Sequence, residues 1–304
     1  MTLDIRSATI LIECARHGSL GRAAVALNMT QPALTRTLKV LEAGFGVSLF
    51  DRTTRGVVPT VYGEALLPYA RLVVSEVANA KDLILQMQGA SRGVVRVGGV
   101  ASVVPSFIVS AIAKMRQSHP EVRFQIVEEM EDLLLEELKS GVIDIAVSPD
   151  PYVDDEITLA TPDILRDVVH VYARPSHPLA SREHVSLEEV GNADWILPPM
   201  GTPIAKEWYQ RFHDKGIEPR IPALASRSIG VIRAAALSQD LLCWLPAPRL
   251  SDQPSSEGLV RIAAPDMQWK RSFRIYRRRR GIVPPPAKIL VQAIRELALP
   301  SDEA

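Results

Sequence analysis

The chain has few of the features that are typical of secreted proteins, of proteins stabilised by a structural metal ion or of membrane proteins. It contains only two cysteines, Cys14 and Cys243, which lie too far apart in the sequence to indicate a disulfide framework or a zinc site. An N-terminal apolar segment behind a basic lead is missing, because Arg6, Glu13 and Arg16 interrupt the early apolar runs. No run approaches the roughly 18 uninterrupted apolar residues of a membrane span. We therefore expect a cytoplasmic protein with no membrane partner, no metal site and no cofactor.

The chain also lacks an excess of charge of either sign. Its 35 lysines and arginines are balanced by 35 aspartates and glutamates. This balance argues against a protein that coats nucleic acid through bulk charge, but it leaves room for a specific binder with a local basic patch. With 47% hydrophobic and 23% charged residues, the composition is typical of folded globular proteins. The length of 304 residues suits about two domains.

The first sixty residues predict three helices. Apolar residues recur at helical spacing from Leu3 until the first helix stops near Gly18. Ser19 is placed to cap a short second helix over residues 20–27. Thr30 is placed to cap a third helix, with Pro32 in its first turn, where a missing backbone donor does no harm. Two short helices joined by a tight turn are typical of helix-turn-helix DNA-binding domains.

The third predicted helix carries polar side chains opposite its apolar stripe. Among such side chains, glutamine can pair with adenine, arginine can pair with guanine, and threonine and lysine can hold phosphates. Residues 49–60 then predict a hairpin with basic and hydroxyl residues at its tip, a wing for the DNA backbone or minor groove. By composition alone, a helical module for protein contacts would fit this segment equally well. The candidate DNA-binding residues are Ser19, Arg22, Thr30, Gln31, Pro32, Thr35, Arg36, Lys39, Arg52, Thr53 and Arg55.

Several motifs in this segment, all in register, resemble the N-terminal part of LysR-type transcription regulators. The motifs are Gly18-Ser19-Leu20-Gly21-Arg22-Ala23-Ala24, Thr30-Gln31-Pro32-Ala33-Leu34-Thr35-Arg36, Leu41-Glu42, Gly46-Val47 and Leu49-Phe50-Asp51-Arg52. The family pattern has an aromatic residue where Leu20 stands and often threonine where Gly21 stands. This departure concerns packing and one phosphate contact rather than the reading helix. The resemblance implies a winged helix-turn-helix that binds DNA.

A long helix is predicted from Val61 to about Gln88. Apolar residues along it recur at spacings of three and four, which forms a short heptad seam. A helix packed on its own domain would show the same pattern, but a position between two domains favours dimerisation. In LysR-type regulators the matching helix pairs antiparallel with a partner's helix, so the resemblance implies a homodimer. It also implies a tetramer, because members of the family usually assemble as a dimer of dimers. The seam residues are Ala70, Val73, Val77, Ala80, Ile84 and Met87.

After residue 92, short apolar runs alternate with helices, which predicts a mostly parallel sheet covered by helices. Strands are predicted at 94–97, 122–127, 143–147, 168–173, 195–197, 221–225, 242–245 and 272–276. Helices are predicted at 103–115, 133–138, about 204–215, about 229–239 and 287–297. The arrangement, together with the segments 119–122 and 138–146, resembles the two-lobed, type-2 periplasmic-binding-protein fold of LysR effector domains.

The predicted fold class is therefore α+β and multidomain. It combines an N-terminal winged helix-turn-helix, a long linker helix and a C-terminal two-lobed α/β effector domain of the periplasmic-binding-protein type. We expect the DNA-binding head at residues 1–60, the linker and dimerisation helix at 61–89 and the effector domain at 93–304. Lobe I is expected to cover about 93–161 and 269–304, and lobe II about 162–268.

Ligands of open α/β sheets bind at the carboxyl ends of strands, often against helix N-termini. That rule selects loops rich in hydroxyl groups and free backbone donors, which would suit a carboxylate or a polyol. Serine and threonine before a helix are often only caps, and Arg227 could equally be a solvated surface residue or the partner of an anionic effector. The candidate effector-binding residues are Ala101, Ser102, Glu129, Met130, Ser148, Gly201, Thr202, Arg227, Ser228 and Ile229.

Two further features are interpreted as structural. A basic run at 270–271, 274 and 277–280 follows a strand-like segment and precedes three prolines, which favours a solvated strand end and turn over a nucleic-acid site. No second cation beside Arg227 is evident for the effector cleft.

Cys243 lies within an apolar run, and a buried cysteine usually behaves as a small hydrophobe.

Together these features predict a non-enzymatic transcription regulator whose binding or activation is modulated by a small molecule between two lobes. The segment 196–203 looks like the subgroup that controls aromatic-acid or sugar catabolism, which implies an effector of one of those classes. Expected partners are double-stranded DNA with an interrupted palindrome near a promoter, the effector, further copies of the chain and RNA polymerase. The rival prediction is an enzyme or solute carrier on the same fold. That rival gives the DNA-reading helix no role, and the selected loops show no histidine or paired carboxylate.

Overall fold

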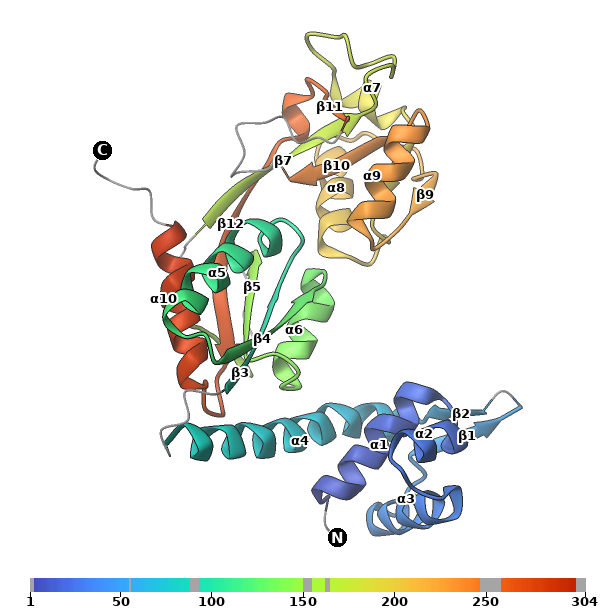
Figure 1. The fold of residues 1–304 in the computed structure, drawn as a ribbon. Helices are drawn as coiled ribbons and strands as arrows, with labels where there is room; N and C mark the ends of the chain where they lie inside the picture. The colour runs from blue at the N-terminus through green and yellow to red at the C-terminus, as the bar shows by residue number, and fades with distance from the viewer. Residues whose placement is uncertain are drawn as a thin grey trace.

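The computed structural model describes residues 3–54, 56–87, 93–149, 155–161, 165–246 and 258–298. Figure 1 shows a small helical head, a long helix α4 that leads away from it, and two α/β lobes beyond that helix. The fold class predicted from the sequence is confirmed. No helix among the described residues is both long enough and apolar enough to cross a membrane.

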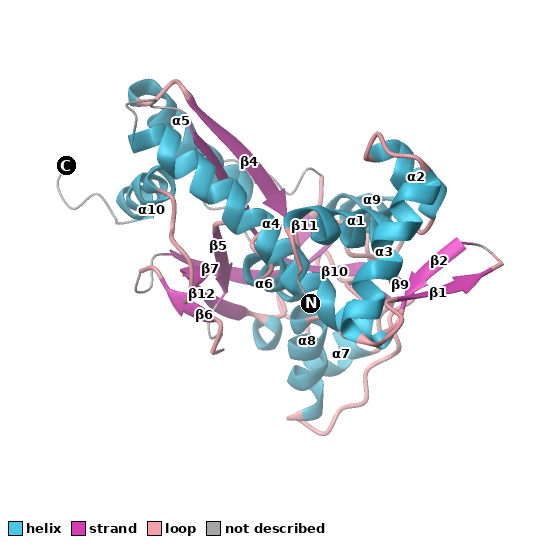
Figure 2. Ribbon diagram, turned by 90° about the horizontal axis from the view of Figure 1, so that it is seen from below, coloured by secondary structure: helices cyan, strands magenta, loops and turns pink. Residues whose placement is uncertain are grey.

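The head is a three-helix unit with a two-stranded wing. Its second and third helices begin where the sequence placed their caps, because the Ser19 side chain accepts a hydrogen bond from the Arg22 amide and the Thr30 side chain accepts one from the Ala33 amide. Seen from below in Figure 2, the hairpin projects from the head as a wing. The elements are α1 (Ile5–His17), α2 (Leu20–Ala26), α3 (Gln31–Phe45), β1 (Phe50–Thr53) and β2 (Gly56–Pro59).

The wing is tied to the head at a position that only glycine can occupy. Gly56 has a φ of 139°, and a Cβ atom there would lie 2.0 Å from the carbonyl oxygen of Gly18. The next amide, that of Val57, donates a hydrogen bond to that same oxygen at 2.9 Å. The turn between α1 and α2 therefore fixes the direction in which the wing leaves the head.

Helix α4 (Val61–Met87) connects the head to the lobes and packs against both. Near its start, Leu67 and Ala70 are buried in the core of the head. The predicted seam is therefore wrong at Ala70, which the chain's own head covers. Further along the helix, Val73 and Val77 are half-buried and Ile84 is 54% exposed, so these three remain available to a partner helix.

The second half of α4 is held to lobe I by polar contacts. The Ser75 hydroxyl donates to the carbonyl oxygen of Gly141 at 2.5 Å. The Arg278 guanidinium donates to the Glu76 carboxylate at 3.0 Å and also to the carbonyl oxygens of residues 138 and 143. These contacts link the orientation of lobe I to the direction of the helix that carries the head.

One ten-stranded sheet runs through both lobes in the order β4-β3-β5-β12-β7-β10-β8-β9, with β6 and β11 pairing beside this path. The strands β4, β3 and β5 are parallel in lobe I, and β10, β8 and β9 are parallel in lobe II. The long strands β7 and β12 are antiparallel to their neighbours, because they cross between the lobes in opposite directions. The sheet is thus mixed, and the predicted parallel order holds only within each lobe.

In Figure 1, α5 and α10 lie on one side of the lobe I strands and α6 on the other. Two crossover strands join the lobes, β7 (Leu165–Ala173) and β12 (Trp269–Arg278). The other elements of lobe I are β3 (Gly93–Gly99), the π-helical turn η1 (Val104–Ile108), α5 (Val109–Ser118), β4 (Val122–Glu128), α6 (Glu131–Lys139), β5 (Ile145–Pro149), β6 (Ile157–Leu159) and α10 (Pro285–Ala298). Those of lobe II are α7 (Leu187–Gly191), β8 (Trp195–Leu197), α8 (Pro203–His213), β9 (Leu224–Ala225), α9 (Ile229–Ser238), β10 (Leu242–Pro246), β11 (Val260–Arg261) and η2 (Pro265–Met267).

Candidate nucleic-acid interface and effector cavity

Helix α3 presents one polar, solvent-facing side. Leu34, Leu38 and Leu41 are buried in the head, and the polar residues predicted to read DNA lie on the opposite side of the helix. They border a shallow hollow, which β1 completes with a basic side chain. The predicted DNA-binding residues that meet there are Gln31, Pro32, Thr35, Arg36, Lys39 and Arg52. Hydrogen-bond donors and positive charge on an exposed helix face are what the major groove of DNA accepts.

Four of the five remaining predicted DNA-binding residues have contacts within the head. Ser19 and Thr30 cap helices, and the Arg22 guanidinium donates to the carbonyl oxygen of His17 at 2.6 Å. The Thr53 hydroxyl donates to the carbonyl oxygen of Gly56 at 3.3 Å and so closes the wing. Arg55 lies outside the described residues. Contact of these five side chains with DNA stays a prediction.

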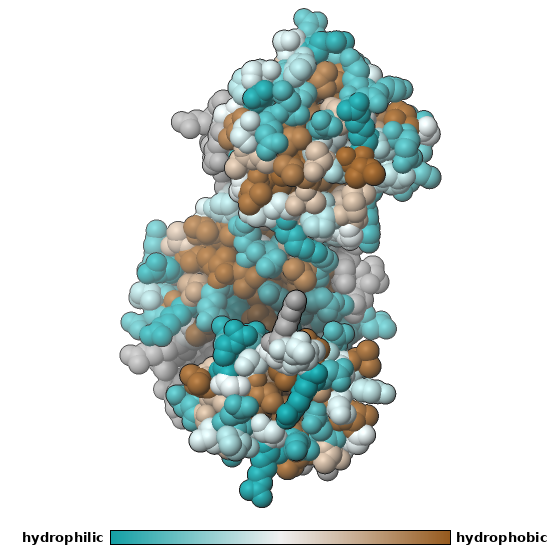
Figure 3. Space-filling view, turned by 90° about the vertical axis from the view of Figure 1, so that its right-hand side faces the viewer, coloured by the Kyte–Doolittle hydropathy of each residue, from teal (hydrophilic) through white to brown (hydrophobic). Residues whose placement is uncertain are grey.

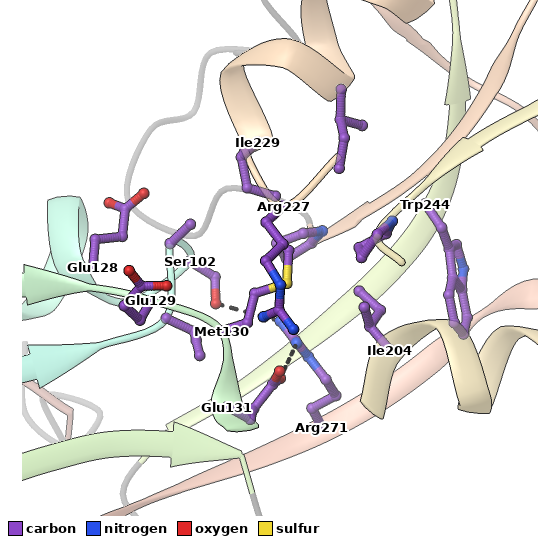
Figure 4. A pocket seen from close by; sticks show the side chains of 15 residues that line it. Ser102, Glu128, Glu129, Met130, Glu131, Ile204, Arg227, Ile229, Trp244 and Arg271 are labelled. Atoms are coloured by element: carbon purple, nitrogen blue, oxygen red, sulfur yellow. Dashed lines mark hydrogen bonds and ion pairs between the residues drawn. The ribbon is translucent and has the colours of Figure 1, made fainter. Parts of the chain in front are cut away.

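A cavity that is partly open to solvent lies between the two lobes. Figure 3 shows apolar side chains gathered on both lobes near their junction. In Figure 4, Glu128 and Glu129 lie on one side of the cavity and Trp244 on the other. The lining residues are Val100, Ala101, Ser102, Glu128, Glu129, Met130, Glu131, Pro198, Ile204, Arg227, Ile229, Ile232, Trp244, Pro246 and Arg271.

Six of the ten predicted effector-binding residues line this cavity. They are Ala101, Ser102, Glu129, Met130, Arg227 and Ile229. Ser148 lines a neighbouring cavity, which shares Glu131 with the first. The other three lie outside both linings: Gly201 is exposed, Thr202 is fully buried with its hydroxyl donating to the carbonyl oxygen of Pro199, and Ser228 caps α9.

The floor of the cavity holds a buried arginine that the sequence analysis assigned to a solvated strand end. The side chain of Arg271 is only 4% exposed and donates two hydrogen bonds to the Asp167 carboxylate, at 2.9 and 2.6 Å. It also lies 3.6 Å from the Glu131 carboxylate and donates to the Ser102 hydroxyl at 3.3 Å (Figure 4). The solvated interpretation is therefore wrong for Arg271, and equally for Arg278, although Arg279 and Arg280 are exposed.

A signal for Arg271 was present in the sequence. Side chains alternate between the two faces of a strand, so Arg271 shares a face with Phe273 and Ile275, which are both buried. A basic residue in register with core positions must find a carboxylate partner. The sheet supplies that partner, because Arg271 pairs with Asp167 across β12 and β7. A second cation therefore lines the cavity, contrary to the sequence analysis.

Arg227 is neither free nor solvated on all sides, because it bridges the two lobes. Its guanidinium donates to both carboxylate oxygens of Asp132, at 3.1 and 2.7 Å. Arg227 precedes α9 in lobe II and lines the cavity, and Asp132 lies in α6 of lobe I and lines the neighbouring cavity, so this ion pair, called the latch below, joins the two lobes beside the cavity. The hydrogen bond from Arg227 holds the pKa of Asp132 below its ordinary value of 3.8.

The pKa of Asp132 sets the pH range over which the latch holds the lobes together. Because the folded-state pKa is lowered, the latch contributes at every pH above about 4 and is lost as the pH falls through the lowered value. Asp132→Asn should remove this contribution at pH 7. The distribution of distances between the two lobes should then become broader. The measurement is electron-spin distance spectroscopy on labels at Arg116→Cys and Lys215→Cys.

The matched control for the latch is Asp194→Asn, which removes a surface ion pair with Arg220 inside lobe II. This control should leave the distance distribution between the lobes unchanged. An identical distribution for Asp132→Asn and the unsubstituted protein at pH 7 would show that the Arg227–Asp132 pair does not hold the lobes.

Two family models match the chain. The model described as bacterial regulatory helix-turn-helix protein, lysR family, matches residues 5–64, and the model described as LysR substrate binding domain matches residues 88–299. The chain belongs to the LysR family. It is a DNA-binding transcriptional regulator with an effector-binding domain, as the resemblance implied.

Relatives and solved structures agree with this assignment. The transcriptional regulator GalR of Pseudomonas putida is 32% identical over 272 residues, which cover 88% of this chain and 68% of the relative. The regulator GbpR of Azospirillum brasilense is 28% identical over 78% of this chain and 70% of its own length. The crystal structure of CbnR, a LysR family regulator, has a TM-score of 0.69 at 22% identity and covers 97% of this chain and 99% of its own. CbnR has also been solved in complex with its target DNA, with a TM-score of 0.66, 21% identity and coverage of 96% and 99% of the two chains.

The thiols of this LysR-family regulator are both buried. Cys243 is 0% exposed, and its burial raises the pKa of the thiol to about 12. Burial likewise raises the pKa of Cys14 to about 11. Both groups are therefore protonated at neutral pH, whereas thiol chemistry proceeds through the thiolate. This agrees with the interpretation of Cys243 as a small core residue.

Proposed function

We propose that the regulator controls transcription by reading an interrupted palindrome near a promoter, with a small molecule between the lobes as the signal. The observation that carries this proposal is the exposed face of α3, where Gln31, Arg36 and Lys39 lie beside Arg52 of the wing. These side chains match the donors that base edges and phosphates accept. A cytoplasmic location follows from the proposed access to chromosomal DNA.

A twofold operator requires two heads, and α4 is the element we propose to pair with a second copy. Its apolar residues Val73 and Val77 are half-buried and Ile84 is 54% exposed, so these side chains offer apolar surface to a partner helix. Burial of such residues against a partner helix would fix the spacing of two recognition helices on one DNA molecule. A dimer of dimers and contact with RNA polymerase extend the same proposal.

For the coupling of signal to DNA, we propose that the effector shifts the balance between arrangements of the two lobes. An effector changes an equilibrium only as far as it binds one arrangement better than the other. Arg227 and Asp132 join the lobes beside the cavity, and Arg278 and Glu76 join lobe I to α4. A change in the cavity can reach the head through these contacts. The proposal includes a head at residues 1–60, a linker helix at 61–89 and an effector domain at 93–304. It includes no catalytic role.

The test of the proposed function is selection of genomic DNA fragments by the purified full-length protein at moderate salt, followed by sequencing. We expect recovery of a short inverted repeat upstream of a neighbouring operon, with half-sites spaced by about one helical turn or a multiple of it, roughly 10 base pairs. Retention of fragments without a shared sequence would contradict specific reading by α3.

A further inference from the structure

The cavity between the lobes has an excess of negative charge. Three of its lining residues are glutamates, and two are arginines. Asp132 and Asp167 add two more carboxylates, each within hydrogen-bond distance of one of the arginines. Among the described residues, five carboxylates and two guanidinium groups therefore lie in or beside the cavity. An anionic ligand entering this site would meet net repulsion.

Neither arginine is available to an anion without loss of an existing ion pair. Arg271 engages both oxygens of Asp167, and the two side chains are only 4% and 7% exposed. Arg227 engages both oxygens of Asp132. A carboxylate ligand that captured either guanidinium would leave an aspartate uncompensated, and in the case of Asp167 that aspartate is buried.

The groups that remain for a ligand are two carboxylate acceptors, one hydroxyl group and apolar surface. The carboxylates of Glu128 and Glu129 make no hydrogen bond or ion pair with any described residue, and an ionised carboxylate can only accept. Ser102 accepts from Arg271 and keeps its own proton to donate. The opposite wall is apolar and includes Ile204 and the ring of Trp244 (Figure 4).

Resting on the proposed function, we propose that the effector is a polyhydroxylated ring compound, neutral or amine-bearing, without a carboxylate. Its hydroxyl or amine groups donate to Glu128 and Glu129, and its carbon face packs on the wall formed by Ile204 and Trp244. Of the two effector classes that the sequence left open, the charges of the cavity favour sugars and disfavour aromatic acids.

The test is the thermal stability of the full-length protein, without DNA, in the presence of three matched sets of probes. The sets are hexoses and pentoses, the corresponding amino sugars, and the corresponding uronic acids together with hydroxybenzoates. We expect at least one neutral or amine-bearing probe to raise the melting temperature by several degrees at saturation, and its acid counterpart to leave it unchanged. Stabilisation by acids alone, or by none of the three sets, would overturn the proposal.

A pair of variants assigns the binding to the cavity. Glu129→Gln keeps the size of the side chain but removes its charge, and should lower the affinity for the stabilising probe at least tenfold. Glu218→Gln, at an exposed glutamate outside the cavity, should leave the affinity unchanged. Equal affinities for the two variants would overturn the assignment. Because these measurements contain no DNA, they stand apart from the proposed function, which fails if a bound probe leaves operator binding and promoter output unchanged.

Discussion

Combined substitution of Gln31→Ala and Arg36→Ala is expected to abolish sequence-specific DNA binding while leaving the fold intact. Both side chains lie on the exposed face of α3, and neither makes a hydrogen bond or ion pair with any described residue. A good bidentate contact to a base is worth about 1–3 kcal/mol of discrimination, so loss of two contacts should lower operator affinity by about 100-fold or more. Titration of an operator duplex by fluorescence anisotropy at fixed salt measures this loss.

The matched control is Arg116→Ala, which removes one positive charge from an exposed position of α5 in lobe I. It should retain full operator affinity. Circular dichroism melting should give the same transition for all three proteins, because no buried contact is changed. If the double variant unfolds at a lower temperature, or binds its operator as tightly as the control, α3 is not the reading helix.

Arg271→Ala is expected to destabilise the effector domain strongly. The substitution leaves Asp167 and Glu131, with side chains 7% and 13% exposed, without their cation. Removal of one partner of a buried ion pair typically costs about 3–5 kcal/mol, because the remaining charge is buried and uncompensated. We expect a fall of that size in the free energy of unfolding, and a loss of any response to cavity ligands.

Tryptophan fluorescence measures this effect without interference from the head. The four tryptophans of the chain, at positions 195, 208, 244 and 269, all lie in the effector domain. Arg280→Ala, at an exposed site close to the end of β12, is the matched control and should change stability by less than about 0.5 kcal/mol. Arg271→Met combined with Asp167→Asn should recover part of the loss. Equal stability of Arg271→Ala and Arg280→Ala would show that the ion pair at the cavity floor is not structural.

The head could be predicted from the sequence because its signals are local. Caps at Ser19 and Thr30, a proline in the first turn of α3 and leucines at helical spacing all act within a few residues. The long helix α4 was found for the same reason. Its packing was not, because Ala70 fits a dimer seam and a core position equally well, and only the folded head shows which of the two it occupies.

The cavity was only partly predictable, because its key contacts join distant parts of the chain. Arg271 and Asp167 are 104 residues apart, and Arg227 and Asp132 are 95 apart. The rule that ligands bind at the carboxyl ends of strands located the loops that carry Ser102 and Glu129. It could not locate Arg271, which lies on a crossover strand that runs between the lobes.

Short elements were missed for a different reason. Strand β6 and helix α7 contain only three and five residues, too few for a periodic pattern to appear. The strand predicted over 221–225 is shortened to Leu224–Ala225, because pairing with β8 reaches only these two residues.

The exposed face of α3 is expected to read base sequence. The most direct test is the ratio of affinities of the full-length protein for its selected operator and for a duplex of the same length and composition with the half-sites scrambled, at one salt concentration. Specific regulators bind their sites at least about 1,000-fold more tightly than unrelated DNA, and we predict a ratio of that order. A ratio near one would mean that the protein holds DNA only through its phosphates and that α3 does not read base sequence.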